Sequence, residues 1–259
     1  MICVELLLGG DEMSTVRYSV LSYYPSFITN ENVNIGVLFY VVENNYANFY
    51  SIKRWERVRA FDDEVDIDFM KDYLKGLSHD VESNLFNCQN KFNIEEFVRY
   101  YVNEYKFSNI QSVETDEVDI FIDETKKMYL KYDFEKKERL GKDKEKQYIN
   151  RLLKSQNIPY SKDKIRGYFN EKIQYDYIIG EYGIKLFTFE GKDLARLINT
   201  AKTWSYTARE MKDRYKTVFI YDKEKRNEYY DSIIQILKEN AQDIMPLDEG
   251  IDYLLSLKQ

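Results

Sequence analysis

The sequence predicts an α+β fold in two parts: an N-terminal antiparallel β-meander with helices, followed by an α/β part with a mixed sheet. Short segments rich in β-branched and aromatic residues follow one another from Val16, separated by polar turns, as in consecutive antiparallel strands. Beyond residue 173 the apolar period changes from strand to helix and back to strand, which favours a parallel pair joined by a crossover. A highly charged stretch separates the two patterns, so we expect domains at 13–123 and 124–259.

The elements of the first part follow from the same patterns. Pro25 ends the first strand and an asparagine-rich turn follows the second. Strands are expected at 16–24, 33–42, 46–52, 108–113 and 118–122. Apolar side chains recur at helical spacing elsewhere, and helices are expected at 65–84, 94–105 and 124–155.

The second part is organised around residues 173–222. A short turn bounded by Gly180 and Gly183 separates two apolar segments at hairpin distance. A long helix is predicted from Asp193, because leucine, isoleucine and alanine then recur every three or four residues. Strands are expected at 173–179, 184–189, 217–221 and 241–247, and further helices at 229–237 and 250–257.

Composition excludes several classes of protein. The chain has 259 residues, of which 44% are hydrophobic and 32% charged, as in folded domains rather than disordered chains. Its net charge of −7 provides no global basic field for nucleic acid. Two cysteines and the single His79 build neither a disulfide framework nor a zinc site. Because so few cysteines indicate an intracellular chain, we expect a cytoplasmic location. Since no apolar run reaches the length of a membrane span, we expect no membrane partner.

Residues 1–12 are expected to be a translated leader, with Met13 as the natural start. Gly9, Gly10 and Asp11 can be encoded by a purine-rich ribosome-binding sequence in frame. The short apolar run before them lacks the basic region and the cleavage site of a signal peptide.

A basic cluster surrounds a tryptophan after the third predicted strand. It contains Lys53, Arg54, Trp55 and Arg57. Such a cluster can bind phosphates or provide a platform on which bases stack. A solvated segment that Trp55 anchors to the sheet explains it equally, and the acidic residues that follow weaken its field.

The first two predicted strands carry a recognisable motif. Tyr18, Val20, Leu21, Tyr23 and Pro25 form the pattern Y-x-V-L-x-Y-x-P, and E-x-V-N-I-G-V follows at residues 31–37. This combination resembles the bacterial DUF3037 family over about residues 16–80. The resemblance identifies a module and implies no activity. Within the motif, Gly36 permits a bulge or a close backbone approach.

The second part resembles the core of the PD-(D/E)XK nuclease superfamily, in which a helix, three strands, a helix and a strand follow one another. Its signature is an acid on one strand and an acid-x-lysine at the end of the next. Asp176 corresponds to the first acid, and Glu190 and Lys192 to the second motif. The resemblance implies that Asp176 and Glu190 hold Mg²⁺ or Mn²⁺ and that all three residues are catalytic, since a divalent metal activates water and stabilises phosphorane charge.

The sequence therefore leads to two hypotheses. The first is a metal-dependent nuclease or a nuclease-derived nucleic-acid-binding protein, linked to conflict with phage or mobile elements. Besides the basic cluster, its nucleic-acid-binding candidates are Lys185, Arg196 and Lys202. The second is a non-catalytic interaction module that binds a host or defence protein or a second copy of itself, because tyrosine is favoured in interfaces. Residue usage resembles that of a low-GC bacterium or its phage.

Overall fold

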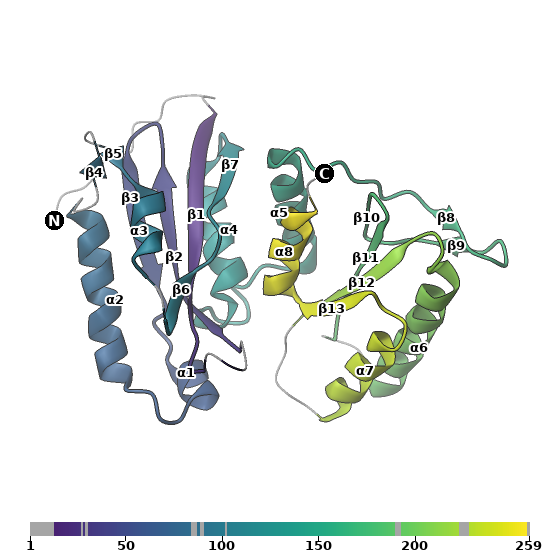
Figure 1. Ribbon diagram of the computed structural model, residues 1–259. Helices are drawn as coiled ribbons and strands as arrows, with labels where there is room; N and C mark the ends of the chain where they lie inside the picture. Colours follow the sequence, from purple (N-terminus) through teal and green to yellow (C-terminus); the bar gives the residue numbers. More distant parts are fainter. Residues whose placement is uncertain are drawn as a thin grey trace. The chain divides into compact units, whose positions relative to one another are not determined.

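A computed structural model describes residues 13–257 apart from 27, 29–30, 84–86, 89–90, 102, 190–192 and 223–227 (Figure 1). The expected leader, residues 1–12, lies outside the described residues. The chain forms two compact units, Met1–Tyr148 and Ile149–Gln259. In the part of the chain that the structure describes, no helix is both long and apolar enough to cross a membrane.

The N-terminal unit is built on a five-stranded sheet, and its predicted antiparallel meander is confirmed. The central strand β1 pairs with β2 along one side and with both β6 and β7 along the other, always antiparallel. β3 continues the sheet beyond β2. The strands are β1 Ser14–Tyr23, β2 Val33–Val41, β3 Tyr46–Ser51, β6 Tyr105–Phe107 and β7 Gln111–Thr115.

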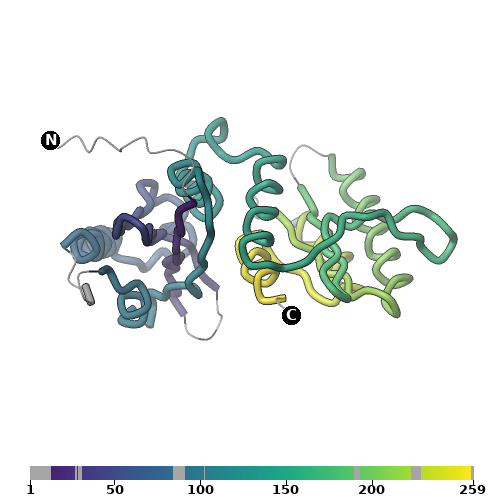
Figure 2. The backbone as a smooth tube through the Cα atoms, turned by 90° about the horizontal axis from the view of Figure 1, so that it is seen from above, coloured from purple at the N-terminus to yellow at the C-terminus, as the bar shows by residue number. Residues whose placement is uncertain are grey.

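Helices cover both faces of this sheet, which explains why most residues of β1 and β2 are buried. On one face, Tyr18 contacts Phe121 of α4 at 5.9 Å between ring centroids. On the other face, Phe49 of β3 and Phe97 of α3 both pack on Phe107 of β6, at 6.4 and 6.1 Å between ring centroids. Figure 2 shows these layers from above.

Two helices of this unit, α2 and α3, begin where a side chain caps their exposed N–H groups. The Asp66 carboxylate accepts from the backbone N–H of Asp68 and Phe69 at the start of α2, at 3.1 and 3.0 Å. Asn93 caps α3 in the same way. The helices are α1 Glu56–Phe61, α2 Ile67–Glu82, α3 Ile94–Arg99, α4 Val118–Tyr129, the 3₁₀ turn η1 Lys131–Asp133 and α5 Lys142–Ser155; a small pair, β4 Asn87–Cys88 and β5 Lys91–Phe92, precedes α3.

The strand predicted at 118–122 is wrong, because this segment is the start of α4. Its buried residues Phe121, Thr125 and Met128 recur at helical spacing, and α4 contacts β1 and β2. The Tyr148 ring of α5 stacks on Phe121 at 5.8 Å, so the compact unit extends beyond residue 123. Whether a shorter domain folds alone stays a prediction.

The C-terminal unit contains the predicted mixed sheet, in the order β10-β11-β12-β13. β10 and β11 are antiparallel, whereas β11, β12 and β13 are parallel. The crossover through α6 therefore joins parallel neighbours, as the sequence predicts. The elements are β8 Ile165–Arg166, β9 Lys172–Ile173, β10 Tyr177–Ile179, β11 Tyr182–Phe187, α6 Leu194–Met211, β12 Lys216–Tyr221, α7 Glu228–Lys238, β13 Asp243–Pro246 and α8 Leu247–Ser256.

Helices also cover both faces of the second sheet (Figure 1). α6 and α7 enclose an apolar core with β11 and β12, in which Leu197, Phe187, Phe219 and Ile233 are buried. α8 packs on the opposite face, where Gly250 lies against Ile220. These layers fix the carboxyl ends of β11 and β12, beside which the acidic residues described next lie.

Candidate functional site

Asp176 lies in the bend before β10, beside the second half of β11. Its backbone N–H donates to the Ile184 carbonyl at 2.9 Å. Its Oδ2 accepts the Leu186 N–H, also at 2.9 Å. Because β10 and β11 are antiparallel, the start of β10 lies at the edge where β11 ends. Asp176 is therefore fixed at the edge from which the chain continues towards Glu190.

Lys185 pairs with this acid. Its Nζ lies 2.9 Å from Asp176 Oδ2 and 4.7 Å from the ring centroid of Trp204. The two charged side chains are only 22% and 11% exposed. The structure thus places Lys185, a predicted nucleic-acid contact, beside the predicted catalytic acid.

Glu190 and Lys192 lie outside the described residues, but both flanks of the segment are fixed. Phe189 is buried, and its N–H donates to Asp222 Oδ1 at 2.8 Å. After the segment, the Asp193 carboxylate accepts the Arg196 N–H at 2.9 Å and caps α6. The catalytic roles of Glu190 and Lys192 stay predictions.

Asp222 is an acid at this edge that the sequence analysis missed. It follows β12, and its own N–H donates to the Phe187 carbonyl at 3.2 Å. The end of β11 is therefore flanked by two carboxylates: Asp176 on the side of β10 and Asp222 on the side of β12. The only available signal was an acid directly after an apolar run.

Carboxylate oxygens are the ligands that Mg²⁺ and Mn²⁺ prefer, so this donor set suits the expected metals. Among the described residues, no group of three or more histidine, cysteine or acidic side chains is arranged to hold a metal ion. A metal site at this edge would need a further ligand besides Asp176, and Glu190 is the predicted one.

Arg196 and Lys202, the remaining cations predicted in this unit, are exposed on α6. Lys202 shares one helix face with Tyr206 and Arg209, since they are spaced by four and three residues. The Arg209 guanidinium lies over the Tyr206 ring, 4.7 Å from its centroid. α6 thus presents cations and an aromatic ring to solvent.

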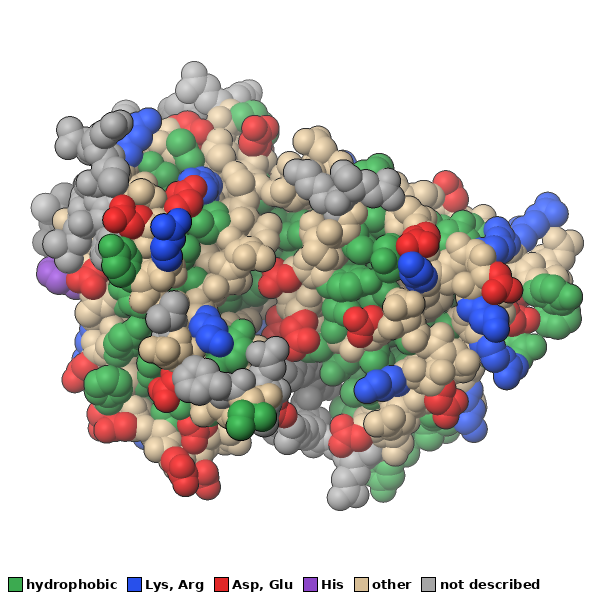
Figure 3. Space-filling model, viewed as in Figure 1, with side chains coloured by type: hydrophobic (Ala, Val, Ile, Leu, Met, Phe, Trp, Pro, Cys, Tyr) green, Lys and Arg blue, Asp and Glu red, His purple; other side chains and the backbone are tan. Residues whose placement is uncertain are grey.

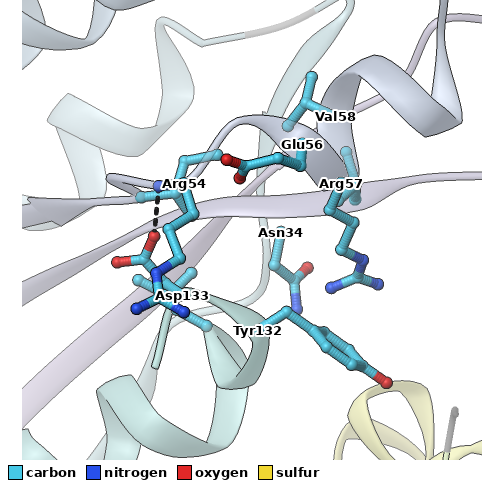
Figure 4. A pocket seen from close by; sticks show the side chains of 10 residues that line it. Asn34, Arg54, Glu56, Arg57, Val58, Tyr132 and Asp133 are labelled. Carbon is cyan, nitrogen blue, oxygen red and sulfur yellow. Dashed lines mark hydrogen bonds between the residues drawn. The ribbon is translucent and has the colours of Figure 1, made fainter. Parts of the chain in front are cut away.

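The N-terminal unit has a cavity of about 150 Å³ beside the basic cluster (Figure 4). Asp133 Oδ1 accepts the backbone N–H of Lys53 and Arg54 at 2.6 and 2.7 Å, which fixes one wall. Figure 4 shows the Asn34 side chain projecting between Arg57 and Asp133. The lining residues are Val33, Asn34, Ile52, Arg54, Glu56, Arg57, Val58, Leu130, Tyr132 and Asp133.

The basic cluster divides between this cavity and the surface. The Arg57 guanidinium lies over the Tyr132 ring at 4.5 Å. The Arg54 guanidinium lies 3.9 Å from Glu135. Trp55 is half-buried and Lys53 is exposed, and neither lines the cavity. Because two arginines and two acids line it, the cavity is balanced in charge rather than strongly basic.

One part of the chain matches a known protein family. Residues 18–131 match the family described as "Protein of unknown function (DUF3037)". The resemblance predicted for the N-terminal part is therefore confirmed, and most of the cavity lining falls within the match. No curated protein and no solved structure matches the chain.

Proposed function

We propose that the C-terminal unit is a metal-dependent nuclease, or a nucleic-acid-binding unit derived from one. The observation that supports the proposal is the pair of carboxylates, Asp176 and Asp222, on either side of the end of β11. The chain leaves this strand end towards Glu190. Asp176 and Glu190 are the proposed ligands of Mg²⁺ or Mn²⁺.

The residues of this edge have separate roles in the proposal. A bound divalent ion supplies an activated water and stabilises negative charge on the phosphoryl group. Asp222 holds the backbone of Phe189 and so positions the segment that carries Glu190. Lys192 follows two residues later and contributes a cation, which suits charge that develops on phosphate oxygens.

Cleavage of single- and double-stranded DNA and RNA tests this proposal, with Mg²⁺ or Mn²⁺ and with EDTA as control. Glu190→Gln keeps the shape of the side chain and removes its charge, so we expect it to abolish cleavage. Glu239→Gln, at an exposed position after α7, is the matched control and should cleave like the wild type. Metal-dependent cleavage that survives Glu190→Gln would refute the assigned site.

A second candidate function is protein interaction through the N-terminal unit. Phe69 and Tyr100 are each 63% exposed. The Phe69 ring stacks on Tyr73 at 6.5 Å, and Tyr73 contacts Tyr101 at 6.3 Å, so an aromatic surface connects α2 with the end of α3. Exposed aromatic clusters of this kind are typical of interfaces.

Light scattering after size exclusion tests self-association through this aromatic surface. If two copies pair there, Phe69→Ser with Tyr100→Ser should convert a dimer into a monomer. Lys75→Ser, at another exposed position of α2, is the control and should leave the mass unchanged. A wild-type protein that is monomeric would exclude pairing of two copies.

A further inference from the structure

The hairpin of β8 and β9 ends in an unusual turn. Ile165 pairs with Ile173, and Arg166 with Lys172. The Asn170 N–H donates to the Gly167 carbonyl at 3.2 Å, and the Gly167 N–H donates to the Glu171 carbonyl at 2.9 Å. Asn170 has a φ of 69°, as in three-residue hairpin loops that end in a left-handed residue. The two central turn positions are occupied by Tyr168 and Phe169.

Both of these aromatic side chains are presented to solvent. Tyr168 is 82% exposed and Phe169 is 69% exposed. Their rings lie 5.3 Å apart at an interplanar angle of 82°, so each can offer a face to a ligand. Central turn positions usually carry glycine or small polar residues, and large exposed apolar groups indicate a binding surface.

The base of the hairpin is held firmly. Ile165 and Ile173 pack in a cluster with Tyr175 and Met211. The Arg214 guanidinium donates to the Arg166 carbonyl at 2.8 Å, which ties the hairpin to the end of α6. The aromatic tip is therefore preorganised, which lowers the entropic penalty of binding.

The charge around the tip is opposite in sign to that of the whole chain. Residues 161–174 carry four basic and two acidic side chains, whereas the chain has a net charge of −7. Lys164, Arg166 and Lys172 are exposed. Hydrophobic side chains with Lys and Arg beside them gather at this end of the unit (Figure 3). Aromatic rings beside cations are the combination that binds single-stranded nucleic acid.

We propose that the β8–β9 hairpin binds nucleic acid by stacking Tyr168 or Phe169 on an unpaired base while Lys164 and Lys172 contact the flanking phosphates. This inference rests on the proposed function and specifies the feature that is recognised, an unpaired base. Because the two rings are nearly perpendicular, a single base stacks on one ring at a time. Because the local charge is positive, it favours nucleic acid, a polyanion, over a protein surface with few acidic residues.

Fluorescence anisotropy with a fluorescein-labelled single-stranded DNA tests the inference, in EDTA so that no cleavage occurs. Tyr168→Ala with Phe169→Ala should weaken binding at least about fivefold, because each base–aromatic stack contributes about that much or more. Tyr168→Phe with Phe169→Tyr keeps both rings and should bind like the wild type. Lys164→Ala with Lys172→Ala should reduce the slope of log affinity against log salt by about 1.4.

The outcomes separate this inference from the proposed function. If the wild type binds and cleaves DNA and the double alanine variant binds equally well, the hairpin assignment is wrong and the nuclease proposal stands. If the wild type neither binds nor cleaves any nucleic acid, both are overturned. A photo-reactive phenylalanine analogue at position 169 should cross-link to DNA, and cross-linking to protein alone in cell extract would contradict the inference.

Discussion

Lys185 Nζ lies 2.9 Å from Asp176 Oδ2, and the same oxygen accepts the backbone N–H of Leu186 at 2.9 Å. A carboxylate binds a divalent metal through an oxygen lone pair, so a metal at Asp176 would compete with Lys185 for this carboxylate. The pair therefore has two consequences, one for stability and one for metal binding.

The pair is expected to stabilise the C-terminal unit. Lys185→Met leaves a largely buried carboxylate without its cation and should lower the free energy of unfolding by about 1–2 kcal/mol. Asp176→Asn with Lys185→Met should lower it by less than the sum of the two single changes, since the residues interact directly. Urea denaturation of the four proteins measures this coupling. Additive losses would show that the pair contributes nothing.

The Phe49 ring lies close to the backbone of Gly36, whereas the surroundings of Gly76 are open. Substitution by alanine should therefore have opposite effects on stability at these two glycines. A Cβ at Gly36 would clash with the Phe49 ring, so Gly36→Ala should destabilise the N-terminal unit by about 1–3 kcal/mol. Gly76 lies in α2, and a Cβ added there would have no atom of the surrounding structure within 4 Å. Gly76→Ala should therefore stabilise the N-terminal unit by about 0.5–1 kcal/mol. Melting curves of both variants provide the comparison, and equal effects would contradict it.

The buried hydroxyls of Tyr18 and Tyr148 predict where the first unit ends. Tyr148 donates to Tyr18 at 3.2 Å and contacts the Thr125 hydroxyl at 3.1 Å. A fragment of residues 13–148 should fold with cooperative unfolding. A fragment of residues 13–123 lacks Tyr148 and the second half of α4. It should be unfolded or molten by circular dichroism and by the dispersion of its amide resonances in NMR spectra. A well-folded short fragment would support the domain boundary that the sequence predicts.

Alkaline pH is expected to weaken the N-terminal unit through Tyr101. Burial, followed by the nearby Asp80 charge, raises the pKa of Tyr101 to about 12, from about 10 in an unfolded chain. The unfolded state then releases its proton first, so the stability from neutral Tyr101 is complete below about pH 10 and is lost as the pH rises towards 12. Urea midpoints between about pH 9 and pH 11 should fall less in Tyr101→Phe than in the wild type. An equal decline in both proteins would exclude this residue as a cause.

The strands and long helices could be predicted because their signals are local. β2 and β12 contain continuous apolar runs, β1 is rich in β-branched and aromatic residues, and α6 shows its period over many residues. The prediction of a strand at 118–122 failed because its run of valine, isoleucine and phenylalanine is too short to distinguish a strand from a helix. Only the packing of Thr125 and Met128 further along α4 resolves it.

The candidate site could be predicted only in part, since its contacts depend on pairing between strands. The resemblance to the nuclease core singled out Asp176 as a candidate. The role of Asp222 depends on β12 lying parallel to β11, which brings it to Phe189. Lys185 was predicted to contact nucleic acid because it is charged, and its pairing with Asp176 could not be read from spacing. The cavity likewise joins Asn34 to Tyr132 and Asp133 across the fold.

Calorimetric titration with Mn²⁺ tests the central claim most directly, because it requires no knowledge of the substrate. The wild type should bind Mn²⁺ at a site that Glu190→Gln and Asp176→Asn each weaken severely, and Glu239→Gln should bind like the wild type. Wild-type protein that binds no Mn²⁺, or binding that both site variants retain, would contradict a metal site at the end of β11.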